Sequence, residues 1–476
     1  MYDANPTKMI CTVGPASSSP EVFAQLLDAG LDVARLNFSH GTHAQMLEVV
    51  RMIRELGERK GRHVALLADL QGPKIRTGAL EGDAPVLLET GNQFVITIAP
   101  VAGTAACVST TYQSLPQDVK PGDTILLDDG LIALEVLSSD ATEVTTCIRA
   151  GGWLGAHKGI NLPGVAISSP SLTEKDRADL DFILQHDLDY IGLSFVRCAE
   201  DVRQLKQLVA ASGCAAAVIA KIEKPEALEE IEEIVEEADG IMVARGDLGV
   251  EMPPEQVPIL QKRITALCGQ RRKPVIIATQ MLDSMREHPR PTRAEASDVA
   301  NAIFSGADAV MLSGETAAGQ YPVESALMMQ RIAAAAEADL LGGAHLRTAA
   351  GDDEFFSFAD AIARSAAEVA ESVGAAAIVA FTHSGSTARL ISMCRTRVPI
   401  FAATPLVSTA RRCHLYWGVR PVLIAPVQDT DEMIINVTRT MKAMGVVKPG
   451  DVIVITAGTP VGQAGGTDTV KLQTII

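Results

Sequence analysis

Aromatic residues and positive charge are both scarce in this sequence. Aromatic side chains make up 4% of the 476 residues and hydrophobic residues 47%, so aliphatic side chains must fill the core. The formal net charge is -17 at pH 7. This acidic balance argues against a broad nucleic-acid-binding or anionic-membrane surface, while leaving room for a small basic pocket that takes a phosphorylated metabolite.

Paired cysteines and membrane signals are also absent. No two cysteines form a CxxC pair; they are scattered as Cys11, Cys107, Cys147, Cys198, Cys214, Cys268, Cys394 and Cys413. This spacing disfavours a zinc site or a disulfide framework and suits a reducing compartment. We expect no signal peptide, and no uninterrupted apolar run approaches the ~20 residues of a membrane span. The sequence predicts a soluble, cytoplasmic protein without membrane or nucleic-acid partners.

Short apolar segments alternate with amphipathic helical segments through much of the chain, whose length suggests about three domains. Eight segments are rich in Val and Ile, as expected for parallel strands covered on both faces. They are residues 8–14, 32–38, 63–70, 190–196, 216–223, 240–247, 274–280 and 308–315. Eight such strands alternating with helices predict an α/β fold of the (β/α)8 TIM-barrel type.

Two further regions follow a different pattern. Residues 72–167 interrupt the barrel with short alternating segments separated by Gly, Asp and Pro turns, which predicts a small all-β domain inserted over the barrel mouth as a lid. Residues 342–356 have the composition of a linker, and residues 354–476 predict an open α/β sheet domain. The expected barrel domain therefore comprises residues 1–71 and 168–340.

Polar and charged residues lie at or just after the C-terminal ends of six of the eight expected strands. They are Arg35, Asn37, Ser39 and His40; Asp69, Lys74 and Arg76; Lys221 and Glu223; Arg245 and Asp247; Thr279 and Gln280; and Ser313 and Glu315. Because active sites of such barrels form at the C-terminal strand ends, we expect these residues to converge on one rim.

The residue types at this rim favour phosphoryl chemistry. Glu223 and Asp247 come from neighbouring strands, and two carboxylates suit Mg²⁺ or Mn²⁺ with the substrate completing the coordination shell. Lys221 lies two residues before Glu223, so both side chains point to the same face of the strand. A lysine and a metal at one point would clamp a phosphoryl group, and Arg35 and Arg76 add guanidinium groups for phosphate oxygens.

Some of these charges also have an ordinary structural interpretation. Arg245 can be read as an ion-pair partner of Glu251 or Glu315. The glutamate-rich stretch 226–240 has apolar residues at helical spacing, which predicts a solvated helix face and not a metal site.

Several long blocks of the sequence resemble one family. They are TKMICTVGPAS (7–17), ARLNFSHG (34–41), GPKIRTG (72–78), KGINLPG (158–164), AKIEKPEAL (220–228), DGIMVARGDLGVE (239–251), ATQMLDSM (278–285) and PTRAEASDVANAIFSGADAVMLSGETAAGQYPVE (291–324). In this order they resemble pyruvate kinase, over essentially the whole chain. The resemblance implies Mg²⁺-dependent phosphoryl transfer from phosphoenolpyruvate to ADP, giving pyruvate and ATP.

The resemblance also implies a role for each rim residue. The implied metal ligands are Glu223 and Asp247; the catalytic residues Lys221, Arg35, Thr279 and Ser313; the substrate-binding residues Gly246, Asp247, Thr279, Lys221 and Arg35; and the nucleotide-binding residues Arg35, Asn37, His40, Arg76 and Lys158. The proton donor to the enolate is left open, with a water relay beside Thr279 and Ser313 as the family's model.

The monovalent-cation region comprises Asn37, Ser39, Asp69, Leu70 and Lys74. Asn37, Ser39 and Asp69 match the family's potassium ligands, but the region departs elsewhere from the many members that need K⁺. Members that need K⁺ have Thr, Lys and Glu where this chain has Leu70, Gln71 and Lys74. The combination resembles the K⁺-independent subgroup, in which the ammonium of Lys74 would replace the missing cation. Thr77 departs from that subgroup, where an aliphatic residue is usual.

Residues 381–392, FTHSGSTARLIS, resemble the family's effector loop. The implied phosphate-binding residues are Thr382, Ser384, Gly385, Ser386 and Thr387. The resemblance implies a phosphorylated allosteric effector, whose identity stays open, and a homotetramer. The alternative is an ordinary strand–turn–helix connection capped by Ser and Thr.

Two other functions compete with this interpretation. One is another Mg²⁺-dependent barrel acting on phosphoenolpyruvate or a 2-oxo acid, such as an aldolase or phosphomutase, which would not need the inserted β domain. The other is a non-catalytic metabolite sensor, which would be expected to have lost one of Lys221, Glu223, Asp247 or Arg35; all four are present.

Overall fold

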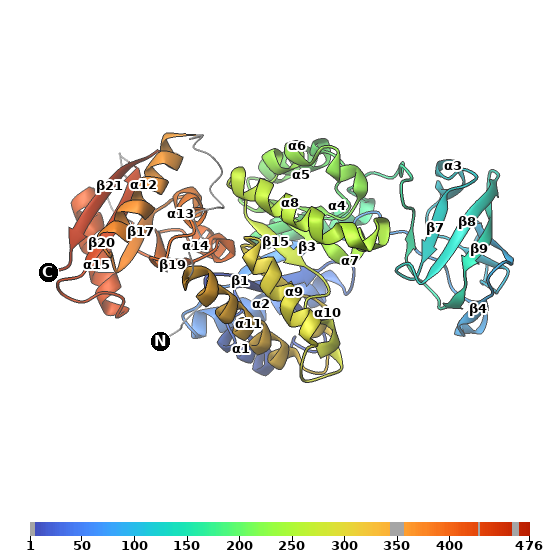
Figure 1. The fold of residues 1–476 in the computed structure, drawn as a ribbon, viewed down its shortest axis with the longest axis horizontal. Helices are drawn as coiled ribbons and strands as arrows, with labels where there is room; N and C mark the ends of the chain where they lie inside the picture. Colours follow the sequence, from blue (N-terminus) through green and yellow to red (C-terminus); the bar gives the residue numbers. More distant parts are fainter. Residues whose placement is uncertain (1–4, 343–356, 427–428, 459–465) are drawn as a thin grey trace.

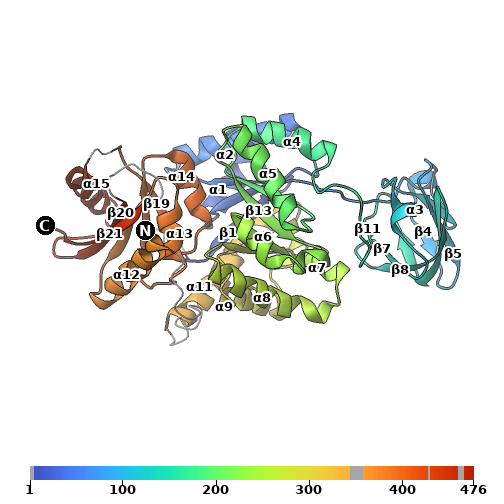
Figure 2. The same ribbon diagram turned by 90° about the horizontal axis from the view of Figure 1, so that it is seen from above.

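Three groups of strands follow one another along the long axis of the molecule (Figure 1). The computed structural model describes residues 5–342, 357–426, 429–458 and 466–476. A closed barrel lies in the middle, a β-rich insert at one end, and a C-terminal sheet with its helices at the other (Figures 1 and 2). No helix in these ranges is long and apolar enough to cross a membrane.

The central barrel consists of parallel strands in the closed order β1-β16-β15-β14-β13-β12-β3-β2. The strands are β1 (Lys8–Val13), β2 (Val33–Asn37), β3 (Ala65–Asp69), β12 (Tyr190–Leu193), β13 (Ala217–Ile222), β14 (Gly240–Ala244), β15 (Val275–Ala278) and β16 (Ala309–Leu312). Each lies within one of the eight expected segments, so the predicted barrel is confirmed. Their residues are almost all buried, because helices cover the outer face and side chains fill the inside.

Helices surround the barrel and pack on it through apolar faces. They are α1 (Pro20–Asp28), α2 (His43–Arg59), α4 (Glu174–Gln185), α5 (Ala199–Ala211), α6 (Ile231–Glu237), α7 (Arg245–Glu251), α8 (Val257–Gln270), α9 (Arg293–Phe304), α10 (Gly314–Ala317) and α11 (Pro322–Gly342). In the glutamate-rich stretch, α6 buries Ile231, Ile234 and Val235 and carries no part of the rim. Its interpretation as a solvated helix is confirmed.

The insert forms its own sheets and its own core. Its larger sheet has the order β11-β7-β8-β9-β5-β6, and β10 pairs with β4. The strands are β4 (Val86–Leu88), β5 (Gln93–Thr97), β6 (Cys107–Ser109), β7 (Thr124–Leu127), β8 (Ile132–Ser139), β9 (Glu143–Ala150), β10 (Gly152–Leu154) and β11 (Ile160–Asn161), with one short helix, α3 (Leu115–Asp118). Alternating residues of these strands are buried, as the period-2 pattern predicts. The insert extends away from the barrel (Figure 2).

The C-terminal part is an open sheet of order β19-β18-β17-β20-β21, in which β21 runs antiparallel to β20. The strands are β17 (Ala377–Phe381), β18 (Ile400–Thr404), β19 (Val419–Leu423), β20 (Val452–Gly458) and β21 (Thr467–Thr474), and the helices are α12 (Phe358–Ser372), α13 (Ser386–Ser392), α14 (Val407–Arg412) and α15 (Thr430–Ala443). The expected open α/β sheet is confirmed. Apart from Gly342, the expected linker 342–356 lies outside the described residues.

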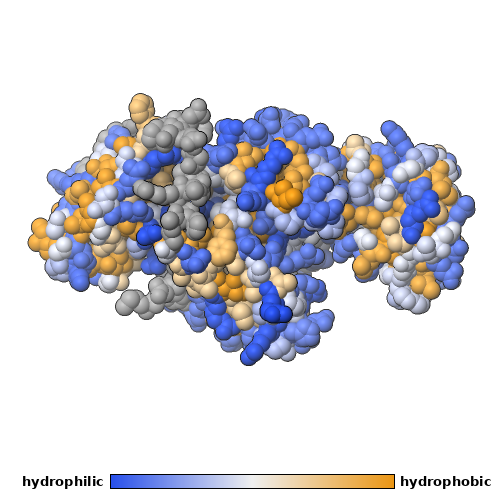
Figure 3. All heavy atoms as spheres, in the orientation of Figure 1, coloured by the Kyte–Doolittle hydropathy of each residue, from blue (hydrophilic) through white to orange (hydrophobic). Residues whose placement is uncertain are grey.

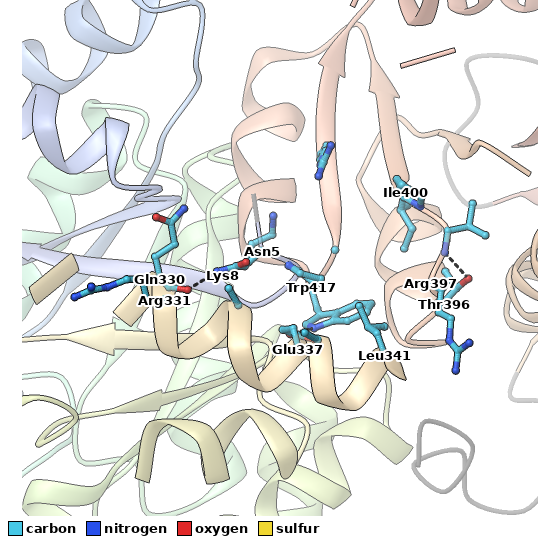
Figure 4. A pocket seen from close by; sticks show the side chains of 17 residues that line it. Asn5, Lys8, Gln330, Arg331, Glu337, Leu341, Thr396, Arg397, Ile400 and Trp417 are labelled. Carbon is cyan, nitrogen blue, oxygen red and sulfur yellow. Dashed lines mark hydrogen bonds between the residues drawn. The ribbon is translucent and has the colours of Figure 1, made fainter. Parts of the chain in front are cut away.

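The C-terminal sheet packs against the N-terminal ends of the barrel strands. Lys8 Nζ donates to the carbonyl oxygen of Val419 at 2.8 Å, and Tyr190 Oη donates to that of Arg412 at 2.6 Å. A pocket of about 530 Å³ lies along this seam, between α11 and residues near β18 and β19 (Figure 4). Because one end of the barrel is covered in this way, the C-terminal strand ends face the insert.

Candidate active site

The centre of the rim is a buried cluster of alternating charges. Lys221 Nζ lies 2.8 Å from Glu223 Oε1 and 3.0 Å from Asp69 Oδ1. Asp69 Oδ2 lies 2.6 Å from Nη2 of Arg35. Asp69 therefore bridges the two cations, and four of the predicted site residues lie together.

Burial and charge act in opposite directions on the pKa values of this cluster. Burial opposes the charge on Lys221, but the attraction of Asp69 and Glu223 outweighs it and raises the pKa of Lys221 above its usual value. Burial likewise favours a neutral Asp69, yet Lys221 and Arg35 hold the pKa of Asp69 below its usual range. Lys221 and Asp69 are therefore both ionised at neutral pH.

Two residues of this cluster were not predicted from the sequence. Ser194 Oγ accepts from Lys221 Nζ at 2.7 Å and donates to the carbonyl oxygen of Leu70 at 2.7 Å. Thr12 Oγ1 accepts from Nη1 of Arg35 at 2.9 Å. Ser194 follows β12 and Thr12 lies in β1, so the two strands that had no predicted rim residue also reach the site. In the sequence, Ser194 and Thr12 are single hydroxyl residues within apolar segments. Only their position near a strand end could have indicated a place in the site.

The two predicted metal ligands, Glu223 and Asp247, come from neighbouring strand ends. Glu223 follows β13 and Asp247 follows β14, and these strands pair in parallel. Burial raises the pKa of Glu223 above its usual value; Lys221 opposes the shift and the negative charge of Asp247 reinforces it. Two adjacent carboxylates that repel each other suit a divalent cation, so this donor set fits Mg²⁺ or Mn²⁺. Among the described residues no group of three or more His, Cys, Asp or Glu side chains forms a metal site, so the substrate and water would supply the other ligands.

The loop after β15 has an unusual backbone conformation that is held from α7. Thr279 and Gln280 have φ values of 66° and 53°, in the left-handed region. Arg245 donates to the carbonyl oxygen of Thr279 at 2.7 Å and pairs with Asp298 at 2.7 Å. The backbone N–H of Gly246 donates to Thr279 Oγ1 at 2.7 Å. Arg245 therefore fixes the predicted substrate-binding residues Thr279 and Gly246 beside each other.

The expected structural partners of Arg245 were wrong. Glu251 instead pairs with Lys224 at 2.6 Å. Glu315 accepts from the backbone N–H groups of Leu282 at 3.0 Å and Ser313 at 2.7 Å, so it stabilises the turn after β16. Sequence spacing could not reveal the pairing of Arg245 with Asp298 or of Glu251 with Lys224, because these residues lie far apart in the chain.

Ser313 is held at the rim by this turn. Its hydroxyl oxygen is buried and has no hydrogen-bond partner in the structure. A buried polar atom without a partner costs free energy, and such atoms often have a functional reason.

A group of positive charges surrounds His40. Burial lowers the pKa of His40, and the positive charges of Arg76, Lys74 and Arg35 lower it further. The structure therefore brings these predicted residues to one side of the rim, where their combined field favours an anion. Lys158 lies on the insert side, where its ammonium pairs with Asp128 at 2.8 Å.

Two residues of the monovalent-cation region, Asn37 and Asp69, already have side-chain partners. Asn37 Oδ1 accepts from the backbone N–H of Ser39 at 3.1 Å. Leu70 is buried, and Lys74 is exposed. Asp69, as described above, is neutralised by Arg35 and Lys221.

The predicted effector loop connects β17 to α13. Gly385 has a φ of 91° and its N–H donates to Thr382 Oγ1 at 2.8 Å. Thr387 Oγ1 lies 2.6 Å from Thr467 Oγ1, a contact that the sequence gave no means of predicting. Ser384 and Ser386 hydroxyls lie 3.0 Å apart at the surface. The Thr382 and Thr387 hydroxyls are thus buried contacts of the fold, whereas those of Ser384 and Ser386 contact each other at the surface.

Comparison with known proteins identifies the family. The model described as "Pyruvate kinase, barrel domain" matches residues 4–326, and the one described as "Pyruvate kinase, alpha/beta domain" matches residues 360–473.

The chain belongs to the pyruvate kinase family. A pyruvate kinase of Geobacillus stearothermophilus is 48% identical over 472 residues, covering 98% of this chain and 80% of the relative. One of Staphylococcus aureus strain USA300 is 46% identical over 473 residues, with the same coverage of 98% and 80%. A crystal structure of a pyruvate kinase from Cryptosporidium parvum superposes with a TM-score of 0.91 at 36% identity, covering 99% of this chain and 96% of that one.

Membership of the pyruvate kinase family decides between the competing functions. The matches span both the barrel and the C-terminal sheet, so an aldolase or phosphomutase is excluded. The chain is a phosphotransferase enzyme, and the charge cluster at the strand ends lies where barrel enzymes of this kind carry out their chemistry.

Ser194→Ala should lower kcat about 10-fold, because Lys221 loses a charged hydrogen bond that fixes its ammonium. Steady-state assay of pyruvate formation measures this. Ser325→Ala is the matched control, since Ser325 is also buried and donates to the carbonyl oxygen of Tyr321 at 2.7 Å in α11. Equal kcat values for Ser194→Ala and the unaltered protein would contradict the assigned contact.

Proposed function

We propose that this pyruvate kinase transfers the phosphoryl group of phosphoenolpyruvate to ADP, giving pyruvate and ATP, as a cytoplasmic homotetramer that uses Mg²⁺ or Mn²⁺ and does not require K⁺. The observation that carries the proposal is the buried cluster in which Asp69 holds Arg35 and Lys221 beside Glu223. It combines fixed positive charge with a carboxylate for a divalent cation. A transferring phosphoryl group needs both.

Lys221 and Arg35 would stabilise the phosphoryl group during transfer. Lys221 stays protonated because its pKa is raised, and it is held by three acceptors that orient its ammonium. Arg35 is fixed by Asp69 and Thr12 before any substrate binds. Charges placed in advance stabilise a transition state without the cost of reorganisation.

Glu223 and Asp247 would hold the divalent cation, which when bound supplies additional positive charge to the phosphoryl oxygens. Gly246, Asp247 and Thr279 would receive the carboxylate of phosphoenolpyruvate. Gly246 N–H now donates to Thr279 Oγ1, and the Thr279 hydroxyl donates to the carbonyl oxygen of Ala278 at 2.6 Å, so both donors would redirect their hydrogen bonds toward the substrate. Thr279 and the unpartnered hydroxyl of Ser313 are the nearest candidates for ordering a water that protonates the enolate.

The nucleotide would bind on the side of the rim nearest the insert. Arg35, Asn37, His40 and Arg76 offer charge and polar groups there, and Lys158 would join them from the insert. Arg76 Nη1 donates to the carbonyl oxygen of His157 at 3.0 Å, so the guanidinium group of Arg76 is held against the same part of the insert that carries Lys158. Movement of the insert toward the barrel would exclude water and bring Lys158 to the phosphates, as a lid does.

Exposed apolar residues on the barrel support self-association. Ile259 of α8 is 69% exposed, Phe304 of α9 45% and Leu327 of α11 42%. The space-filling view shows hydrophobic side chains in separate areas of this barrel face, with hydrophilic ones between them (Figure 3). Exposed apolar side chains of this size suit a protein interface.

The purified protein should convert phosphoenolpyruvate and ADP to pyruvate and ATP only when Mg²⁺ or Mn²⁺ is present. A coupled assay with and without the cation measures this, and light scattering of the same sample checks the homotetramer.

Lys221→Met should reduce kcat at least 10³-fold, because the phosphoryl group in transfer loses the positive charge of the Lys221 ammonium. Full activity after removal of divalent cations, or in Lys221→Met, would overturn the proposal.

Independence from K⁺ is proposed from the residues of the monovalent-cation region. Lys74 adds a positive charge near His40, and Leu70 offers no side-chain oxygen to a cation. A tethered ammonium can take the place of a bound monovalent ion near a phosphate.

Activity should therefore be similar in K⁺ and in tetramethylammonium buffers, whereas Lys74→Glu should lower K⁺-free activity and create a response to K⁺. Lys120→Glu, an exposed lysine of the insert, is the control for a simple charge reversal. Stimulation of the unaltered protein by K⁺ of more than about tenfold would refute this assignment.

An effector phosphate is proposed to bind at the loop between β17 and α13. The hydroxyls of Ser384 and Ser386 lie at the surface, and α13 begins directly after Gly385. Hydroxyl groups beside the start of a helix suit a phosphate.

A panel of phosphorylated sugars and nucleoside monophosphates should include one that lowers the half-saturating concentration of phosphoenolpyruvate. The double variant Ser384→Ala/Ser386→Ala should lose that response, while Ser372→Ala on α12 should keep it. Retention of the full response by the double variant would show that the phosphate binds elsewhere.

A further inference from the structure

One buried carboxylate joins three separate segments beside the rim. Glu251, at the end of α7, places Oε1 2.6 Å from Lys224 Nζ and accepts from Asn161 Nδ2 at 3.0 Å. Lys224 comes directly after Glu223 at the end of β13, and α7 contains Asp247 as well as Glu251. Asn161 lies in β11, where the chain leaves the insert. A single carboxylate oxygen on α7 therefore contacts both the segment after β13 and the insert.

Lys224 leads directly to the predicted metal ligand. It is the next residue after Glu223, and its Nζ lies 5.9 Å from the ring centre of Phe195. The backbone N–H of Phe195 donates to Glu223 Oε2 at 2.8 Å. A displacement of Lys224 would therefore disturb Glu223 in two ways. It would pull on the adjoining backbone, and it would move Phe195, whose N–H donates to the Glu223 carboxylate.

The chain's entry into the insert contacts the same residue. Gly72 has a φ of 66°, and a Cβ atom at this position would lie 2.7 Å from Cδ2 of Phe195. The backbone at Gly72, where the chain enters the insert, thus packs on Phe195 and leaves no room for a side chain. The chain therefore contacts the surroundings of Glu223 both where it enters the insert, through Gly72 and Phe195, and where it leaves it, through Asn161 and Glu251.

A contribution to the stability of the fold does not by itself explain why Glu251 is a carboxylate at this buried position. The side chains of Lys224 and Glu251 are only 4% and 1% exposed, so forming this pair costs much desolvation free energy. Moreover, Glu251 Oε2 is buried and has no hydrogen-bond partner. An apolar pair of similar volume would stabilise the fold at least as well.

We propose that Glu251 is a positioning residue, which fixes Glu223 and Asp247 relative to each other and transmits the position of the insert to them through Asn161. This inference rests on the proposed role of Glu223 and Asp247 as metal ligands. When Asn161 moves with the insert, the Glu251 carboxylate shifts, and the α7 and β13 ends shift with it. Partners of metal ligands that act in this way typically change metal affinity or activity 10–100-fold when replaced.

Four variants test the proposal by thermal unfolding, by Mn²⁺ binding measured with electron paramagnetic resonance, and by kcat and KM. They are Glu251→Gln, Asn161→Ala, the double variant Lys224→Met/Glu251→Leu, and the control Asp189→Asn. Asp189 is matched in burial, with its side chain 1% exposed, and it pairs with Arg411 at 2.7 Å at the opposite end of the barrel.

Glu251→Gln should lower Tm and weaken Mn²⁺ binding at least 10-fold. Asn161→Ala should leave Tm unchanged but lower kcat and weaken Mn²⁺ binding several-fold, with little change in KM for phosphoenolpyruvate. The double variant should recover Tm, because no charge is left buried alone, without recovering Mn²⁺ affinity or kcat. Asp189→Asn should lower Tm and leave Mn²⁺ affinity and kcat unchanged.

Unaltered Mn²⁺ affinity and kcat in Asn161→Ala, or full recovery of both in the double variant, would overturn the proposal and reduce Glu251 to an ordinary ion-pair partner. Failure of the proposed function is separable from this result. If the unaltered protein formed no pyruvate from phosphoenolpyruvate and ADP, Mn²⁺ titration of the same variants would still report whether Glu251 positions the carboxylates.

Discussion

The active site depends on the buried carboxylate of Asp69. Arg35 and Lys221 are both positive and would repel each other at the barrel mouth if nothing lay between them. Asp69 lies between them and is itself kept ionised by them. Because Asp69 and Lys221 are buried and Arg35 is half-buried, removal of one member would leave a poorly compensated charge, so the three must be retained together. The rest of the rim is arranged around this fixed group.

The two ends of the barrel have different physical characters. At the N-terminal end, side chains from inside the barrel share a buried apolar cluster with the C-terminal sheet, including Ile10, Leu67, Ala366 and Ile391. At the C-terminal end, charges and hydroxyls replace the apolar contacts. Rigid packing at one end thus supports a polar site at the other, and this division resembles the usual separation of stability and catalysis in such barrels.

Much of the fold could be predicted from the sequence because it depends on local patterns. Continuous apolar runs gave all eight barrel strands, and the polar residues that follow them gave Lys221, Glu223, Arg35 and Asp69 at one place. Contacts between distant segments could not be predicted in this way. Arg245 pairs with Asp298, Ser194 contacts Lys221 and Thr387 meets Thr467, because strand order and helix placement bring them together in space. The left-handed backbone at Thr279 had no sequence signal either, since threonine rarely adopts it.

The pairing of β1 with β16 also has a consequence for the order of synthesis. Lys8 pairs with Ala309, so the barrel cannot close until almost two thirds of the chain has been made. The insert, by contrast, draws all its strands from Val86 to Asn161 and can complete its own core while the barrel is still open. During translation the first three barrel strands must therefore wait, with apolar faces unpaired, while a folded insert separates them from their partners. This interval makes the nascent chain a natural client for chaperones.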